Sequence, residues 1–110
     1  DEVAALEANV ATYAGNRRLL TEALAGLGIT RIAPPDGAFY LYADVGELTR
    51  DSLAWCQELL DATGVAINTG RDFDAVHGDR FVRISFAVSA EETLGAIERI
   101  DGWVRRRRRA

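Results

Sequence analysis

Residues 80–92, RFVRISFAVSAEE, alternate in polarity with a period of two and then run into a helix-start signal. Successive side chains of a β-strand point to opposite faces, so this stretch predicts a strand with one wholly apolar face. The opposite face carries Arg83, a guanidinium in the middle of an otherwise strand-forming run. A fold built on this strand therefore covers one side of a sheet and presents Arg83 on the other. The apolar face comprises Val82, Ile84, Phe86 and Val88.

Two helices, over residues 50–63 and 89–104, are predicted to cover the apolar face of the sheet. The second begins with a capping box, S-x-x-E, from Ser89 to Glu92. The first has hydroxyl and carboxylate side chains available to cap its start, and Gly64 stands where a C-terminal cap belongs. The candidates at its start are Thr49 and Asp51. The residues expected to face inward are Leu53, Cys56, Leu59 and Leu60 in the first helix and Leu94, Ile97, Ile100 and Val104 in the second.

A long helix is predicted over residues 1–27, because apolar side chains recur there at spacings of three and four and Arg17 fills the one gap. Gly15 and Asn16 weaken its middle, so a kink or break is expected at that point. Such a helix is roughly 40 Å long at 1.5 Å per residue, too long for a core of this size. We therefore expect its first half, with Val3, Leu6 and Val10, to pack on something outside this chain. The whole stripe is Val3, Leu6, Val10, Tyr13, Leu20, Leu24 and Leu27.

The remaining segments predict short strands and one loop. Residues 32–33 and 39–44 are expected to form strands joined by the turn PPDG, and residues 65–68, VAIN, to form another strand before an irregular loop over 69–79. The order of elements predicts an α+β fold. We expect a small, mainly antiparallel sheet of 3–4 strands with helices on one face, preceded by a long interdomain-type helix.

The length of 110 residues suits a single domain, which we assign to residues 1–104, with the α+β core over 31–104. A basic tail is expected at 105–110. Hydrophobic residues make up 48% of the chain, a value typical of globular domains. There is no methionine, so we expect the chain to be a piece of a longer protein.

The charge distribution separates the terminal arginine run from the rest of the chain. All 13 basic residues are arginines, and five of them form the run at 105–109. Without that run, eight arginines face 17 acidic residues, which gives a net charge of −9. We therefore expect no binding of nucleic acid or of a membrane surface, and no apolar stretch approaches the ~18 residues of a membrane span. The arginine run itself is interpreted as a solvated terminus or as a counterweight to the acidic body and the last helix dipole.

The residue inventory excludes several chemistries. The chain has no lysine, so no ε-amine is available for a Schiff base. Cys56 is the single cysteine and cannot form an internal disulfide, which fits a reducing, cytoplasmic setting. His77 is the single histidine, and with Cys56 it supplies too few ligands for a metal site. We therefore expect no Schiff-base lysine and no metal-binding residue on this chain.

Three motifs occur in the order and spacing of a known family. PPDGAFYLYADV matches the pattern P-x-G-x-F-Y, VAINTGRDF matches V-x-x-x-P-G-x-x-F except that Thr69 replaces the usual proline, and FVRISF matches R-(I/L)-S/C-F/Y. With the final S-x-E-E helix, the chain over residues 1–104 resembles the C-terminal small domain of the class I and II aminotransferases. The exchange at Thr69 is expected to loosen the loop slightly and to do little else. The matching residues are Pro35, Gly37, Phe39, Tyr40, Val65, Gly70, Phe73, Arg83, Ile84, Ser85 and Phe86.

The resemblance implies a role for Arg83 and for the missing part of the protein. These fold-type-I enzymes use pyridoxal 5′-phosphate (PLP), and the corresponding arginine binds the α-carboxylate of the amino-acid or 2-oxo-acid substrate. PLP would be bound by a separate large domain, and the full-length enzyme would be a cytoplasmic homodimer. The resemblance places the catalytic and cofactor-binding residues in that large domain, so we expect none on this chain and expect the fragment alone to be inactive. The resemblance does not separate transaminases from PLP lyases and synthases of the same fold.

Plainer interpretations of the same residues remain open at this stage. Arg83 is also compatible with a strand arginine paired to an acidic neighbour. A small α+β domain of this kind would also suit a free-standing module that senses amino acids. Phe39 and Phe73 are interpreted as packing anchors beside turns, rather than as groups that touch substrate. The acidic candidates near Arg83 are Asp44, Asp72 and Asp79.

Overall fold

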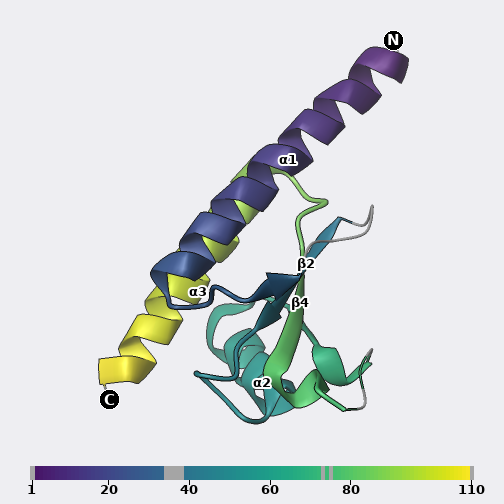
Figure 1. Ribbon diagram of the computed structural model, residues 1–110. Coiled ribbons are helices and arrows are strands. Elements are labelled where there is room, and N and C mark those ends of the chain that lie inside the picture. Colours follow the sequence, from purple (N-terminus) through teal and green to yellow (C-terminus); the bar gives the residue numbers. More distant parts are fainter. Residues whose placement is uncertain (1, 34–38, 73, 75, 110) are drawn as a thin grey trace.

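The computed structural model describes residues 2–33, 39–72, 74 and 76–109, and of residues 6, 72 and 109 only the backbone. Helices and strands are mixed along the chain, as predicted for an α+β fold, and one sheet lies beside a pair of long helices (Figure 1). The elements are α1 (Glu2–Gly26), β1 (Ile32–Ala33), β2 (Tyr40–Asp44), α2 (Ser52–Thr63), β3 (Asn68–Thr69), β4 (Phe81–Ser85), α3 (Ala90–Arg109), and two 3₁₀ turns, η1 (Gly70–Asp72) and η2 (Gly78–Arg80).

The sheet has four strands in the order β1-β2-β4-β3, and every neighbouring pair is antiparallel. This confirms the predicted antiparallel sheet, although two strands differ in length or position. β4 ends at Ser85 and does not continue to residue 88. The strand predicted over 65–68 is displaced to Asn68–Thr69, because Gly64 takes a left-handed conformation and the Val65 amide bonds Thr63 Oγ1.

The apolar face of the sheet is buried under the helices, as the alternation in β4 predicted. Val82 and Ile84 are buried in β4, and Leu41 and Ala43 are buried beside them in β2. Because strand residues alternate, Arg83 lies on the opposite face, where it is only partly buried. The phase of β4 inferred from sequence is therefore confirmed. The helical residues of this core include Leu20, Leu24, Trp55, Leu59, Ile100 and Val104.

Helix α1 is continuous, so the predicted break at Gly15 and Asn16 is wrong. The reason is a long-range contact. Asn16 is buried, and its Nδ2 donates to the carbonyl oxygens of Phe86 at 3.1 Å and Val88 at 2.8 Å. Asn16 thus takes the inward position that the sequence pattern assigned to the next residue, Arg17, which is exposed.

The first half of α1 projects beyond the rest of the molecule (Figure 1). Val3 is 64% exposed and Val10 is 53% exposed, which confirms that this chain covers them poorly. The Leu6 side chain lies outside the described residues. The second half packs along α3, where Leu24 is buried, and Leu27, directly after the helix, is buried as well. A helix within a protein gains most of its stability from tertiary packing, and the projecting half of α1 offers exposed apolar side chains for such a contact elsewhere.

The inward faces of α2 and α3 are rotated relative to the predicted stripes. Leu53, Leu60 and Leu94 are exposed, against expectation. Two tryptophans take the inward positions instead, and the rings of Trp55 and Trp103 meet edge-on at 5.3 Å between centroids. An indole ring buries more apolar area than a leucine side chain, so its burial fixes the rotation of both helices.

The predicted helix caps at three positions are confirmed. Asp51 Oδ1 accepts from the Ala54 amide at the start of α2, and Gly64 ends that helix with φ of 78°. Ser89 Oγ accepts from the Glu92 amide at 3.0 Å, so the capping box starts α3. None of the helices in the described part of the chain is long and apolar enough to cross a membrane.

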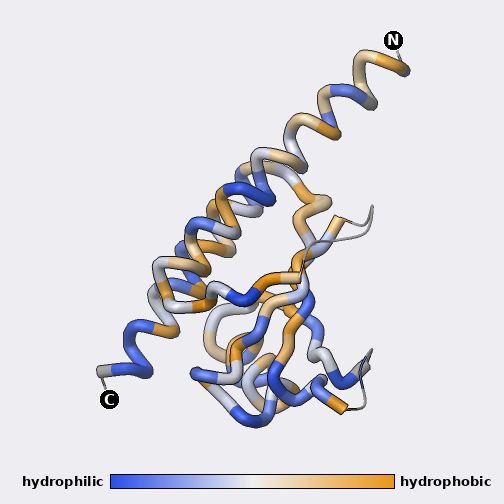
Figure 2. The backbone as a smooth tube through the Cα atoms, in the orientation of Figure 1, coloured by the Kyte–Doolittle hydropathy of each residue, from blue (hydrophilic) through white to orange (hydrophobic). Residues whose placement is uncertain are grey.

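Helix α3 does not end at Val104 but continues through the arginine run to Arg109 (Figure 2). These arginines are not simply solvated. Arg105 pairs with Asp101, one turn earlier, at 2.9 Å. Arg107 pairs with Glu58 of α2 at 2.6 Å and lies over the Trp103 ring, and Arg108 Nη2 donates to the carbonyl oxygen of Leu27 after α1. The run therefore ties the end of α3 to the middle of α2 and to the residue that follows α1.

Candidate functional site

The uncovered face of the sheet places Arg83 in the middle of a row that crosses three strands. In the antiparallel register Tyr42 of β2 lies opposite Arg83 of β4, and Asn68 of β3 lies opposite Arg83 on its other side. Residues directly opposite each other in a sheet point to the same face. The row therefore brings a phenol, a guanidinium and a carboxamide together on the face that the helices do not cover.

The Arg83 guanidinium lies over the ring of Tyr40, with 4.9 Å from Cζ to the ring centroid. This cation–π contact covers one face of the planar group and orients it without neutralising its charge. Arg83, Tyr40 and Asn68 line a shallow depression of about 290 Å³, together with Phe39 and Ser85. A strand arginine at the edge of such a hollow is suited to holding a small anion.

Two of the three acidic residues considered as partners for Arg83 are bound to other arginines. Asp44 pairs with Arg80 at 3.0 Å, and its other oxygen accepts from the Gly46 amide. Asp79 pairs with Arg71 at 3.3 Å. The third, Asp72, has a side chain outside the described residues.

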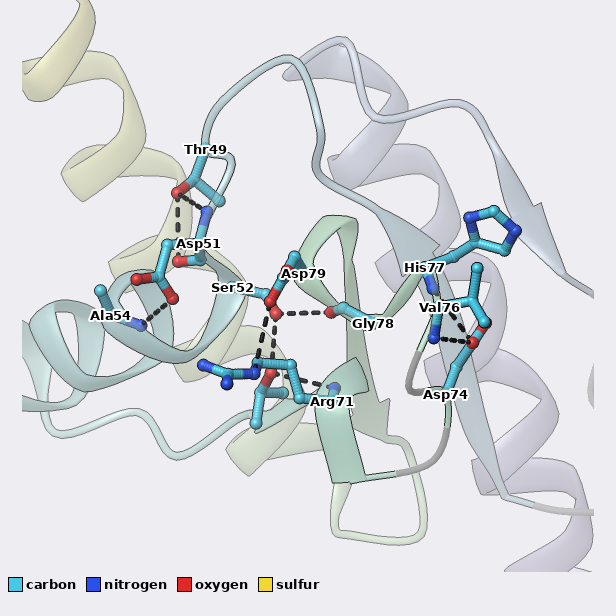
Figure 3. A network of polar contacts seen from close by, with 11 residues as sticks. Thr49, Asp51, Ser52, Ala54, Arg71, Asp74, Val76, His77, Gly78 and Asp79 are labelled. Atoms are coloured by element: carbon cyan, nitrogen blue, oxygen red, sulfur yellow. Dashed lines mark hydrogen bonds and ion pairs between the residues drawn. The ribbon is translucent and has the colours of Figure 1, made fainter.

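A buried hydroxyl network fixes the loop that follows β3 (Figure 3). Ser52, fully buried at the start of α2, lies 2.6 Å from Thr69 Oγ1 and donates to the Gly78 carbonyl oxygen at 2.6 Å. Thr69 Oγ1 also accepts from the Arg71 amide. The expectation that Thr69 loosens this loop is therefore wrong, because its hydroxyl joins the loop to α2 in a way that proline cannot.

The Thr69 network gives a direct stability prediction. Thr69→Val keeps the shape of the side chain but removes the hydroxyl, so the Ser52 hydroxyl and the Arg71 amide each lose a partner in a buried region. We expect the free energy of unfolding to fall by about 1–3 kcal/mol. Chemical denaturation measures this change. Thr21→Val is the matched control, because the Thr21 hydroxyl donates to the Arg17 carbonyl oxygen on the exposed side of α1. If Thr21→Val lowered the free energy of unfolding as much as Thr69→Val, the role of the buried network would be contradicted.

The end of the same loop is shaped by Asp74. Its Oδ1 accepts from the amides of Val76 at 2.9 Å and His77 at 3.0 Å (Figure 3). The bonds from His77 and Val76 favour the charged carboxylate, so they lower the pKa of Asp74 below its ordinary value. The stabilisation is therefore present above the ordinary pKa of aspartate and is lost as the pH falls through the lowered pKa.

Tyr42 supports the loop from below. Its ring stacks on Phe81 at 4.6 Å with an interplanar angle of 7°, and its hydroxyl is buried without a partner among the described residues. Burial, followed by the nearby charge of Asp74, raises the pKa of the Tyr42 phenol. The phenol therefore stays neutral over the physiological pH range, and its ring packs beside the loop as a neutral aromatic surface.

The other residues that drew attention in the sequence have plain structural roles. Cys56 is buried in the core, and His77 is exposed. The described residues contain no group of three or more metal-ligating side chains. Phe39 meets Tyr13 and Phe86 edge-on at 5.3 and 6.2 Å, as expected for a packing anchor, yet it remains 48% exposed at the depression. Phe73 lies outside the described residues.

Fold and site together define a class: a one-sided α+β domain that presents an arginine on the open face of its sheet. A profile of the family "Aminotransferase class I and II" matches residues 1–100, and the chain belongs to this family. The expected fold and family are thereby confirmed.

Curated and solved relatives agree with the family assignment. The chain is 51% identical over 104 residues to a valine–pyruvate aminotransferase of Mycobacterium tuberculosis, and this match covers 94% of the chain and 27% of that protein. A crystal structure of an aminotransferase from M. tuberculosis superposes with a TM-score of 0.87 at 52% identity, over 92% of this chain and 26% of that one. The aspartate aminotransferase of Thermotoga maritima gives a TM-score of 0.72 at 33% identity, over 87% and 24%. The chain thus spans about a quarter of each relative.

Proposed function

We propose that this chain is the C-terminal small domain of a PLP-dependent aminotransferase, and that Arg83 binds the α-carboxylate of its amino-acid and 2-oxo-acid substrates. The observation that carries the proposal is the position of Arg83 on the open face of the sheet. Its guanidinium lies against the Tyr40 ring, at the edge of a depression. The aminotransferase names of the relatives support this function over a free-standing sensing module.

The chemistry of Arg83 suits this role. Its planar fork of N–H donors matches the two oxygens of a carboxylate, and a strand holds it more rigidly than a loop would. A fixed carboxylate orients the Cα–H bond of the substrate toward the reacting group of another domain. The open face would then be closed by that domain, which excludes water and strengthens the charged hydrogen bonds.

PLP does not fit this chain as a resident group. The cofactor attaches to a lysine amine when bound and supplies the electron sink for amino-group transfer. All 13 basic residues here are arginines, and the depression beside Arg83 is lined by Phe39, Tyr40, Asn68 and Ser85. In the proposed enzyme, the attachment and the phosphate contacts come from a separate large domain.

The lack of lysine predicts that PLP does not attach covalently to this chain. After the N-terminal amine is blocked, the 110-residue chain mixed with PLP should show no visible absorbance of a protein–PLP adduct and no PLP mass after borohydride reduction. The full-length protein, treated in the same way, is the positive control. An adduct on the blocked chain would contradict this account.

Valine and pyruvate are the substrates to test first, because the 51% identical relative is named a valine–pyruvate aminotransferase. We also propose that the full-length enzyme is a cytoplasmic homodimer. The buried thiol of Cys56, the single cysteine of the chain, fits a reducing compartment, and the exposed Val3 and Val10 offer a surface for a second domain or subunit. The test of the function is amino transfer from valine to pyruvate by the full-length protein with PLP. Absence of transfer with valine, aspartate and aromatic amino acids alike would contradict it.

A further inference from the structure

Asn68 occupies a position in the depression that the proposed function leaves unexplained. It is one of only two residues in β3, and its register partner in β4 is Arg83. Cβ atoms of directly opposed residues in a sheet lie about 4.5–5.5 Å apart. Asn68 is exposed, and it lines the same depression as the arginine. A ligand held by the Arg83 fork would therefore lie within reach of the carboxamide.

We propose that Asn68 is a second carboxylate-binding residue, which donates a carboxamide N–H to an oxygen of the carboxylate that Arg83 holds. This inference rests on the proposed function and deepens it. A carboxylate offers about four lone-pair sites, and the arginine fork fills two of them. A neutral amide can fill a further one without neutralising the guanidinium. The class of ligand is thereby narrowed to compounds with a free carboxylate next to the reacting carbon.

The frame around Asn68 is rigid enough for this task. The next residue, Thr69, is buried and lies opposite Val82, which is fully buried in β4. Thr69 is also joined to the fully buried Ser52 at 2.6 Å. β3 therefore cannot slide along β4 without breaking a buried bond, and the register that opposes Asn68 to Arg83 is fixed.

Of the two other polar side chains of the depression, Ser85 and Tyr40, the serine is less available. Ser85 Oγ donates to the carbonyl oxygen of Phe39 at 3.4 Å and accepts from the Ala87 amide at 3.3 Å. Both bonds hold the end of β4 in place. On the tyrosine side, the ring of Tyr40 already lies against the guanidinium. Asn68 is therefore the lining residue best placed to add a hydrogen bond to a bound carboxylate.

The test uses the full-length enzyme with PLP and compares valine with isobutylamine, which is valine without its carboxylate. Asn68→Leu removes the N–H donor, so kcat/KM for valine should fall about 10-fold in the single-turnover half-reaction. Asn68→Asp places a competing carboxylate beside Arg83, so the fall should be larger, about 30- to 100-fold, mostly in KM. For isobutylamine, kcat/KM should change by less than about 3-fold in both variants. The dissociation constant of isovalerate, a carboxylate without the amine, should rise in parallel.

Gln57→Glu is the matched control, because it makes the same amide-to-carboxylate exchange at an exposed position of α2, close to Asn68 but outside the depression that Arg83 lines. It should leave both substrates unchanged. If the Asn68 variants lower kcat/KM equally for valine and isobutylamine, or lower it for neither, the inference is overturned. The proposed function is tested separately with Arg83→Leu. If Arg83 alone holds the carboxylate, this variant should still lower kcat/KM for valine far more than kcat/KM for isobutylamine.

Discussion

Replacement of Arg83 by leucine in the full-length enzyme should lower kcat/KM for amino and 2-oxo acids by about 30- to 5,000-fold, while PLP stays bound. When a guanidinium holds a carboxylate in a closed site, both partners are charged and both are partly removed from water. Removing one partner of such a pair typically costs about 2–5 kcal/mol. Arg83 belongs to β4 and has its ring contact with Tyr40, whereas the attachment of PLP requires a lysine amine, which this chain lacks. The cofactor should therefore be unaffected.

Two comparisons make this result specific to carboxylate binding. Arg83→Lys keeps the charge but loses the fork, so it should recover only part of the activity. Isobutylamine never uses the anchor, so its kcat/KM should be nearly indifferent to either substitution. Arg105→Leu, which removes an exposed arginine paired with Asp101 on α3, should change neither substrate. Equal losses for valine and isobutylamine in Arg83→Leu would show that Arg83 supports the fold and does not hold substrate.

Local signals in the sequence predicted the elements whose stability is decided locally. The alternation in residues 81–85 reflects burial on one face, so it placed Val82 and Ile84 in the core and Arg83 opposite them. The Ser89 capping box and the Gly64 cap depend on side chains and backbone within four residues of the helix end. Such features need no knowledge of the tertiary fold.

The features that were missed depend on contacts between distant segments. Asn16 looked like a helix breaker, because its bonds to the carbonyls of Phe86 and Val88 cross 70 or more residues of sequence. Leu53 and Leu60 looked buried, because the pairing of Trp55 with Trp103 that turns α2 is likewise non-local. Propensity is overridden by tertiary packing in both cases.

The surroundings of Arg83 were missed for a related reason. Sequence motifs single out the arginine, but the neighbours of a strand residue depend on strand order and register. Tyr40 is in the family motif without any sign that its ring meets the guanidinium, and Asn68 stands at a position that its motif leaves unspecified. Once β3 is known to pair with β4, the period of two places Asn68 on the same face. The alternation that places Asn68 beside Arg83 is thus present in the sequence, but it becomes informative only when the order of the strands is known.

Substitution of Gly78 by alanine should be among the most destabilising single-methyl changes in this chain. A Cβ on Gly78 would lie 2.5 Å from the Arg71 amide nitrogen and 2.6 Å from both Arg71 Cα and the Gly70 carbonyl carbon. These are backbone atoms of η1, so no side-chain rotation relieves the clash. The Gly78 carbonyl oxygen also accepts the buried Ser52 hydroxyl at 2.6 Å, so any shift of η2 would strain that bond. Two loop segments pack here through glycine, and an added methyl must separate them.

We expect Gly78→Ala to lower the free energy of unfolding by about 1–3 kcal/mol, the usual cost of overpacking. For a chain of this size, the thermal midpoint should then fall by about 4–15 °C. Gly95→Ala is the matched control, because a Cβ at Gly95, in α3, meets no described atom within 4 Å. Alanine favours the helix over glycine, so that variant should gain about 0.5–1 kcal/mol. The two substitutions add the same methyl group, and differential scanning calorimetry should move their midpoints in opposite directions. Midpoints that move together would show that the contact between η1 and η2 relaxes at no cost, and that the loop beside Arg83 is not held by the packing of Gly78 against Arg71.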